Sequence, residues 1–212
     1  MDTPAIPLDK RFRGYLPVIV DIETAGFNAK KNALLEIAAV IAELNSNGDL
    51  EITERYSTHV IPFKNSELDE AALKFNGIDP HHPFRMAIDE KEALELLFKP
   101  IRQAIKRNNC TRAILVGHNP AFDMAFLNAA IARTQIKRSP FHPFSSFDTA
   151  TLGGLAYQQT VLAKIAQTAG LEWDNEKAHS ALYDAEKTAE LFCMIVNLFK
   201  PLLGNNQQHQ TT

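Results

Sequence analysis

The sequence has little cysteine. Cys110 and Cys193 are the only two among its 212 residues, and neither lies in a Cys-x-x-Cys or Cys/His pattern. A zinc site and a framework of disulfide bonds are therefore not expected. Few, isolated cysteines are typical of proteins in reducing compartments, so we expect a cytoplasmic protein.

Long apolar runs are also missing. No uninterrupted apolar stretch approaches the roughly 18 residues that indicate a membrane-spanning helix. Segment 1–17 mixes Asp, Lys, Arg and Pro and lacks the apolar core of a signal peptide. With 45% hydrophobic and 22% charged residues, the composition is that of a soluble globular protein. The length fits a single domain, which we expect over residues 1–204, followed by a disordered tail over 205–212.

An acidic pair follows an early apolar run. The β-branched stretch Val18–Val20 leads into Asp21 and Glu23, which are separated by one residue. Side chains alternate across a strand, so both carboxylates point to the same face, about 7 Å apart. They repel by roughly 2 kcal/mol, which a proton, a basic partner or a hard cation such as Mg²⁺ can offset. Taken alone, the pair favours simple solvation at a strand end, so the rest of the sequence has to decide.

Positive charge is unevenly distributed, although the whole chain carries a net charge of -3. Segment 99–147 contains eight basic residues and one acidic residue, Asp123, which gives it a net charge of +7 and leaves -10 for the rest. This division indicates a polyanion-binding face on an otherwise acidic body. The alternative is that the basic side chains are ordinary solvated residues on helix surfaces.

Hydrophobic patterning predicts strands early in the chain. The run 18–23 is followed by an apolar stretch over 34–44 and an alternating segment over 51–60. Asn47-Gly48, between the last two, is a strong hairpin signal. We therefore expect three consecutive antiparallel strands, and later a short strand over 112–116.

Apolar periodicity and capping signals predict helices over 66–75, 89–108, 120–133, 159–168 and 180–199. Asn65 or Ser66 is expected to cap the first helix, and Asn119 the third. Pro100 predicts a kink or break in the second. After the third helix, 135–146 is expected to form an irregular loop.

Four separated pieces of the sequence place an acidic residue beside a turn or a strand end. They are Asp21-x-Glu23, Asp123, Asp148 and His179-x4-Asp184. Their order and contexts resemble the DEDD superfamily of 3′-to-5′ exonucleases. The histidine five residues before the last aspartate marks the DEDDh branch, because the tyrosine branch carries Tyr where this chain has Ser180.

Almost the whole chain is similar to the ribonuclease T family within that branch. The most specific stretches are Asn76–Pro80, Lys137–Phe144 and Ala178–Asp184. The resemblance implies an α/β fold of the ribonuclease H-like type, a five-stranded mixed sheet whose first three strands are antiparallel, flanked by helices. The order of elements predicted from the patterning agrees with this arrangement.

The resemblance also implies a metal site. In the family, the matching positions converge on two Mg²⁺ ions, for which Mn²⁺ can substitute; here they are Asp21, Glu23, Asp123 and Asp184. Two such metals bind the scissile phosphate, generate hydroxide and stabilise the leaving oxygen. His179 joins the candidate metal and catalytic set as general base, because an imidazole can take a proton near neutral pH. Asp148, followed by Thr149 at a turn, fits helix capping instead.

Four phenylalanines match family positions that stack on terminal bases: Phe27, Phe75, Phe122 and Phe144. Such stacking holds a single strand and is worth on the order of 1 to 3 kcal/mol per base; the alternative for each is burial in the core. The chain departs from the family pattern at Ala71, where the family has Glu. Base discrimination that relies on that Glu is in doubt here unless Glu70 reaches the same place.

The resemblance further implies a two-fold homodimer in which a basic patch of one subunit guides RNA toward the carboxylates of the other. The positions that fit such a patch are Arg11, Arg13, Lys106, Arg112 and Lys137. Phosphate contacts of this kind are salt-sensitive and largely independent of sequence.

Together, the residues and the resemblance predict a Mg²⁺-dependent 3′-to-5′ exoribonuclease that trims short single-stranded 3′ ends of structured RNAs. The resemblance implies tRNA end turnover and maturation of small stable RNAs and ribosomal RNA, with release of 5′-mononucleotides. Activity on single-stranded DNA is compatible with the same site. Two alternatives stay open: a DNA-directed exonuclease of the proofreading type and a non-catalytic RNA-binding module.

Overall fold

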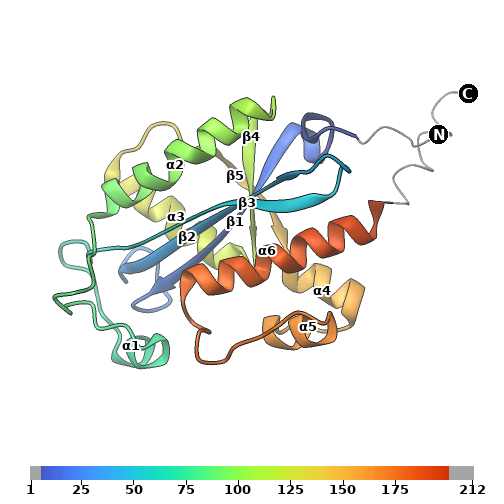
Figure 1. Ribbon diagram of the computed structural model, residues 1–212. Helices are drawn as coiled ribbons and strands as arrows, with labels where there is room; N and C mark the ends of the chain where they lie inside the picture. The colour runs from blue at the N-terminus through green and yellow to red at the C-terminus, as the bar shows by residue number, and fades with distance from the viewer. Residues whose placement is uncertain (1–5, 201–212) are drawn as a thin grey trace, which may run out of the picture.

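The computed structural model describes residues 6–200 (Figure 1). Its strands are β1 (Tyr15–Thr24), β2 (Leu34–Leu44), β3 (Leu50–His59), β4 (Arg112–Gly117) and β5 (Phe141–Asp148). They form one five-stranded sheet in the order β3-β2-β1-β4-β5. The first three strands pair antiparallel, whereas β4 runs parallel to β1 and β5 runs parallel to β4. The fold class predicted from the sequence is confirmed.

Helices cover both faces of this sheet (Figure 1). They are α1 (Glu70–Asn76), α2 (Glu90–Arg107), α3 (Ala121–Thr134), α4 (Thr149–Tyr157), α5 (Leu162–Thr168) and α6 (Ala181–Leu198). The long helices α2 and α6 lie on opposite sides of the sheet, and each contacts β1, β2 and β3. The middle of the sheet is therefore shielded from water on both faces.

The burial of each strand follows its place in the sheet. In β2, nine consecutive residues from Leu34 to Ala42 are buried, as expected of a strand covered on both faces. β3 lies at the edge and mostly alternates between half-buried and exposed side chains. Phe98 of α2, Phe126 of α3 and Phe192 of α6 are among the largest fully buried side chains. The core thus lies between the sheet and these three helices.

Two predicted helix caps are wrong. α1 begins after Asp69, whose side chain accepts hydrogen bonds from the first turn at 2.8 and 3.3 Å, so neither Asn65 nor Ser66 is its cap. Asn119 does not cap α3, because its backbone is left-handed (φ 61°) and Pro120 occupies the position before the helix. Several residues able to cap precede each helix, and local sequence alone does not single one out.

The predicted break in the second helix is absent, since α2 continues through Pro100. A proline inside a helix costs about 3 kcal/mol. Leu94, Leu97 and Ile101 of the same helix are buried, and each contributes about 1.5 to 3 kcal/mol. Burial of this apolar face therefore outweighs the local cost of the proline.

Strand β5 replaces the second part of the predicted loop 135–146. Its residues pair in parallel with β4, so the prediction of an irregular loop there is wrong. Pro143 has no N–H to donate, but β5 is an edge strand, where this loss is tolerated. Pairing with β4 thus overrides the local preference of a segment rich in proline and histidine.

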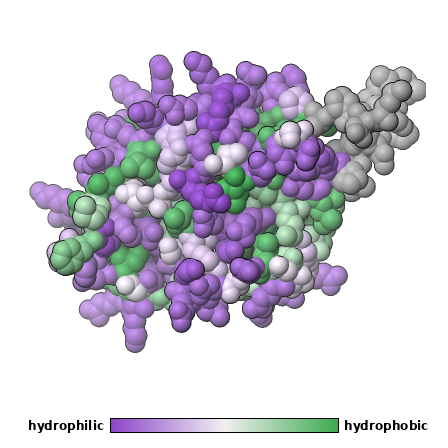
Figure 2. All heavy atoms as spheres, viewed as in Figure 1, coloured by the Kyte–Doolittle hydropathy of each residue, from purple (hydrophilic) through white to green (hydrophobic). Residues whose placement is uncertain are grey.

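The predicted domain end at residue 204 and the predicted tail over 205–212 lie outside the described residues. Within residues 6–200, no helix is long and apolar enough to cross a membrane. Both cysteines are buried and free. Figure 2 shows a largely hydrophilic face on which hydrophobic residues form separate small patches, so this face offers no broad apolar surface.

Candidate active site

Four carboxylates come from three elements that meet at one end of the sheet. Asp21 and Glu23 lie near the C-terminal end of β1. Asp123 lies in the first turn of α3, which follows β4, and β4 pairs in parallel with β1. Asp184 lies in the first turn of α6. The charges of the other three all act on Asp21, so the fold brings the predicted metal residues together.

Burial and mutual repulsion raise the pKa values of these carboxyl groups. Burial raises the pKa of Asp21 well above its ordinary value, and the charge of Asp123 is the largest of the neighbouring charges that add to the rise. Burial, followed by the charges of Asp184 and Glu36, raises the pKa of Glu23 to about 8. Burial raises the pKa of Asp123 to about 7. Without a cation, the group therefore retains protons near neutral pH.

The donor set fits a divalent cation. Within residues 6–200, no Lys or Arg forms an ion pair with any of the four carboxylates. The buried Oδ1 atom of Asp184 has no hydrogen-bond partner. Glu23, His179 and Asp184 each offer a ligand atom, and these atoms lie within 4.8 Å of one another. Carboxylate oxygens are ligands that Mg²⁺ and Mn²⁺ prefer, and a cation would satisfy the free oxygen.

His179 lies on the segment between α5 and α6, and this segment contains no helix or strand. Its backbone is left-handed (φ 69°), and its N–H donates to Oδ2 of Asp184 at 3.0 Å. The exposed imidazole lies against Phe75, with ring centroids 4.4 Å apart. The predicted base is thus next to the carboxylates and open to solvent.

Three of the four predicted phenylalanines line one cleft beside Glu23. The cleft has a volume of about 340 Å³, and its aromatic lining residues are Phe27, Phe75 and Phe122. Phe27 is 87% exposed and meets Phe122 edge to face, with ring centroids 6.1 Å apart. Phe144 does not line this cleft; it is 77% exposed on β5, beside His142.

The departure from the family pattern falls in this same cleft. Ala71 is one of its lining residues, whereas Glu70 is not. Asp69 also lines the cleft, but its carboxylate caps α1. A methyl group therefore stands where the family has a carboxylate, and Glu70 does not replace it.

Two of the predicted basic residues, Arg112 and Lys137, line a second cavity of about 560 Å³, here called the basic cavity. Its other basic lining residues are Arg102, Arg138 and His142. Arg112 pairs with Tyr15 at the start of β1, whereas Asp21 lies six residues further along that strand. At about 3.3 Å per residue, Tyr15 and Asp21 are about 20 Å apart along β1, so Arg112 lies well away from Asp21.

The other predicted basic residues lie outside the basic cavity. Arg13 and Lys106 are exposed. Arg11 is buried, and its guanidinium donates to the carbonyl oxygens of Ile6 at 2.8 Å and Gly48 at 3.2 Å. Arg11 thus holds the N-terminal segment in place and does not belong to an exposed basic face.

A family model described as an exonuclease, RNase_T, matches residues 18–192. Ribonuclease T of Vibrio vulnificus (strain YJ016) is 58% identical over 205 residues, which cover 96% of this chain and 94% of that protein. The chain belongs to the ribonuclease T family of exonucleases. Ribonuclease T of Vibrio campbellii (strain ATCC BAA-1116) is 56% identical over 205 residues, with 96% of both chains covered.

Solved structures share the fold of this exonuclease. E. coli exonuclease I in complex with a dT13 oligonucleotide superposes with a TM-score of 0.67 at 16% identity. The match covers 90% of this chain but 43% of exonuclease I, so the chain spans less than half of that protein. A 3′-exonuclease that recognises the 3′ end of the histone mRNA stem-loop superposes with a TM-score of 0.65 at 18% identity, over 85% of this chain and 81% of that one.

Sequence reasoning misses two residues beside the site of this exonuclease. Glu36 is buried and lies opposite Glu23 in the pairing of β1 with β2. Burial raises the pKa of Glu36, and the charge of His59 opposes the rise. Asn76 donates to the carbonyl oxygen of Thr24 at 3.0 Å, and its side chain opposes the rise in the pKa of Glu23. The signal that indicates Glu36 is a glutamate near the start of a largely apolar strand, far from the second glutamate, Glu43, near the end of that strand.

Asp148 has the structural role predicted for it. Its carboxylate caps α4 by accepting from the N–H of Ala150 at 3.0 Å, and it accepts from the Thr151 hydroxyl at 2.5 Å. It also accepts from the N–H of Asn119 at 3.1 Å. Partial burial favours a higher pKa, but these hydrogen bonds hold the pKa of Asp148 below its ordinary value. Its hydrogen-bonding capacity is therefore used by the protein itself.

Proposed function

We propose that this exonuclease is a Mg²⁺-dependent 3′-to-5′ exoribonuclease that trims short single-stranded 3′ ends of structured RNAs. The observation that carries the proposal is a buried group of four carboxylates that adjoins His179 and an aromatic cleft. Relatives named ribonuclease T support RNA as the substrate. We assign to it the tasks implied by the family resemblance, tRNA end turnover and maturation of small stable RNAs and ribosomal RNA, in the cytoplasm.

The four carboxylates would hold two Mg²⁺ ions, or Mn²⁺ in their place. They belong to Asp21, Glu23, Asp123 and Asp184. Two observations on residues 6–200 support this assignment: the carboxylates have no basic partner there, and the Oδ1 atom of Asp184 has no hydrogen-bond partner there. When bound, the ions neutralise the scissile phosphate, activate water and stabilise the leaving oxygen. The ions also remove the need for protons on the carboxylates, whose pKa values are raised.

His179 acts as the general base. Its exposed imidazole can accept the proton of the attacking water and pass it to solvent. The water oxygen bonds to phosphorus while the bond between phosphorus and the 3′ oxygen of the preceding nucleotide breaks. The phosphate stays on the 5′ oxygen of the released nucleotide, so the product is a 5′-mononucleotide.

The aromatic cleft holds the terminal bases. Phe27, Phe75 and Phe122 offer ring faces within one cleft next to Glu23, and stacking on such rings does not depend on the base or on the sugar. Single-stranded DNA is therefore expected to be accepted as well. Phe144, exposed on β5, adds a further surface for the strand.

The basic cavity of one subunit holds RNA whose 3′ end enters the carboxylate site of a second subunit. Arg112 of this cavity pairs with the start of β1, about 20 Å along that strand from Asp21 of its own chain, which supports a role at a partner's site. We assign a homodimer in which Arg112 and Lys137 hold the phosphates of an RNA whose 3′ end enters the other subunit. Arg13 and Lys106, both exposed, extend this surface. The buried Arg11 does not contact RNA; it holds the N-terminal segment beside this surface through its hydrogen bonds to Ile6 and Gly48.

The test is product analysis on a 5′-labelled RNA stem with a short single-stranded 3′ tail, with Mg²⁺ or with EDTA. The native protein is compared with His179→Ala and with His81→Ala, which changes an exposed histidine outside the site. We expect Mg²⁺-dependent shortening from the 3′ end that halts near the duplex. The shortening should be largely lost in His179→Ala and retained in His81→Ala.

Two other outcomes contradict the proposal. Shortening of a DNA strand of the same sequence with no action on RNA identifies a DNA-directed exonuclease. Binding of the RNA without shortening under every metal condition identifies a non-catalytic RNA-binding module.

A further inference from the structure

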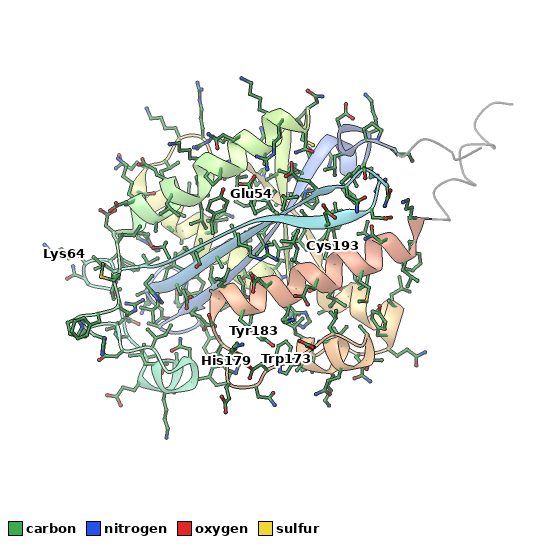
Figure 3. The ribbon with its side chains drawn as sticks, viewed as in Figure 1. Glu54, Lys64, Trp173, His179, Tyr183 and Cys193 are labelled. Atoms are coloured by element: carbon green, nitrogen blue, oxygen red, sulfur yellow. The ribbon has the colours of Figure 1, made fainter. Side chains whose placement is uncertain are left out.

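The segment that carries His179 is tied to the rest of the protein at few points. Residues 172–178 connect α5 to the turn before α6 and contain no helix or strand. Figure 3 shows Trp173, His179 and Tyr183 grouped near the N-terminal part of α6. His179 is held through its backbone to Asp184 (3.0 Å) and through its ring to Phe75, so its place also depends on what fixes the residues before it.

Tyr183 is the residue of α6 that reaches this segment. Its hydroxyl oxygen accepts a hydrogen bond from the backbone N–H of Asp174 at 2.6 Å. The indole of Trp173 packs against its ring nearly at a right angle, with centroids 5.5 Å apart and an interplanar angle of 67°. On the other side, the Nζ atom of Lys187 lies 5.7 Å from the ring centroid. The tyrosine is thus fixed in the helix and contacts two consecutive residues of the segment.

Asp174 in turn organises the residues that lead to His179. Its side chain accepts from the N–H of Glu176 at 3.0 Å, and its carbonyl oxygen accepts from the N–H of Ala178 at 3.2 Å. Lys177 forms an ion pair with its carboxylate at 3.3 Å. The turn from 174 to 178 is therefore one hydrogen-bonded unit that ends directly before His179.

The contacts within this turn do not attach it to the body of the protein. Trp173 donates its indole N–H to Asn175, which belongs to the same segment. Within residues 6–200, the bond to the Tyr183 hydroxyl is the one hydrogen bond that joins residues 172–178 to another element. Loss of that oxygen would weaken the attachment of the turn to α6 and leave the packing of Trp173 against the Tyr183 ring.

We propose that Tyr183 is a positioning residue that docks the His179 segment on α6 through its hydroxyl and its ring. The inference rests on the proposed role of His179 as general base. The Tyr183 side chain belongs neither to the group of possible metal ligands nor to the lining of the aromatic cleft. Its removal therefore acts on the rate of the chemical step and leaves RNA binding in the cleft intact.

The expected size of the effect follows from a single hydrogen bond. A net contribution of about 1 kcal/mol corresponds to a roughly fivefold change in the equilibrium between docked and undocked segment. We expect Tyr183→Phe to lower the single-turnover cleavage rate by up to about fivefold, with an unchanged Kd for RNA. Tyr183→Ala, which also removes the ring beneath Trp173, is expected to lower the rate further.

The chain supplies its own probe for this test, because Trp173 is its one tryptophan. Acrylamide quenching of Trp173 fluorescence is measured without RNA and without metal in the native protein, in Tyr183→Phe and in Tyr157→Phe. The last variant is the matched control, since the Tyr157 hydroxyl donates to the sulfur of Met194 at 3.1 Å, away from the segment. Cleavage rates, Kd values and thermal unfolding are measured on the same variants and on the double variant Tyr183→Phe/His179→Ala.

Support requires three results together: quenching increases in Tyr183→Phe but not in Tyr157→Phe, the cleavage rate falls with Kd unchanged, and the double variant is no slower than His179→Ala. Unchanged quenching, or a further loss in the double variant, overturns the proposal. A fully active His179→Ala would instead refute the assigned base. The quenching result is independent of that outcome, so the two failures are distinguishable.

Discussion

Glu36 lies directly opposite Glu23 in the pairing of β1 with β2. Residues paired in this way project from the same face of a sheet. Glu36 is 8% exposed, and its charge contributes to the raised pKa of Glu23. A fifth carboxylate is therefore part of the electrostatics of the site, although it belongs to none of the sequence motifs.

Glu36→Gln is expected to lower the pKa of Glu23 from about 8, because it removes a neighbouring negative charge. Gln is similar in size to Glu, so the packing is expected to stay the same. Cation binding needs ionised carboxylates, so its pH midpoint should move to lower pH. Calorimetric titration with Mn²⁺ over a pH series measures this midpoint. Glu51→Gln, on the exposed side of β3, is the control, and an equal midpoint in the two variants would contradict the assignment.

The stability of the metal-free protein is expected to fall as pH rises. The pKa values of Glu23 and Asp123 are raised to about 8 and about 7 in the folded protein, above the 4.5 and 3.8 of free carboxyl groups. Between the pKa values of the free and the folded carboxyl groups, the folded state binds more protons than the unfolded state. The stabilisation is therefore complete below the free values of 4.5 and 3.8, and it is lost as the pH rises through the folded values of about 7 and about 8. Mg²⁺ should reverse the decline.

Thermal unfolding in EDTA and in Mg²⁺, at an acidic and at a mildly alkaline pH, measures this effect. The increase in Tm caused by Mg²⁺ should be much larger at the alkaline pH, where the carboxylates have lost their protons. An increase of equal size at both values would mean that the four carboxylates do not bind the ion.

The aromatic cleft gives a prediction about binding. Phe27→Ala removes one stacking surface worth about 1 to 3 kcal/mol, so the Kd for single-stranded RNA should rise roughly 5- to 150-fold with little change in the single-turnover rate. Phe75→Ala should change both quantities, because that ring also contacts His179. Phe84→Ala is the control, since Phe84 is 82% exposed outside the cleft. Equal Kd values for all three variants would rule out the cleft as the base-binding site.

The proposed homodimer predicts complementation between damaged subunits. Asp184→Asn removes a carboxylate, and the pair Arg112→Glu with Lys137→Glu reverses the charge of two of the four Lys and Arg residues that line the basic cavity and so cancels its net positive charge. Each variant alone should degrade RNA poorly. Mixed dimers hold one intact carboxylate site that faces one intact basic cavity, so part of the activity should return. A chain that carries all three changes cannot complement either variant and serves as control. No recovery after exchange of subunits would show that each subunit serves its own site.

Local signals were sufficient for the parts of the fold that depend on neighbouring residues. The run before Asp21, the hairpin at Asn47-Gly48 and the strand over 112–116 all follow from patterning that covers a few residues. The convergence of Asp123 and Asp184 on β1 depends on strand pairing and helix packing between distant segments. The residues alone did not predict it, and the family resemblance supplied it.

The errors have a common physical cause. β5 forms because β4 offers it a partner, and α2 continues through Pro100 because its apolar face is buried. Arg11 is buried because its guanidinium donates hydrogen bonds to carbonyl oxygens of Ile6 and Gly48, and Gly48 comes close to it only in the folded chain. In each case a tertiary interaction outweighs a local preference, and local preference is what a single sequence displays.

The location of Asp184 on α6 has a consequence for how the protein is made. This last helix of the described chain supplies one of the four carboxylates and holds the His179 segment. Because synthesis proceeds from the N-terminus, a ribosome-bound chain that has exposed the sheet but not yet α6 lacks both. A chain whose α6 has not yet packed onto the sheet therefore lacks part of the carboxylate group and the support of the His179 segment, so the candidate site forms only after α6 has been made.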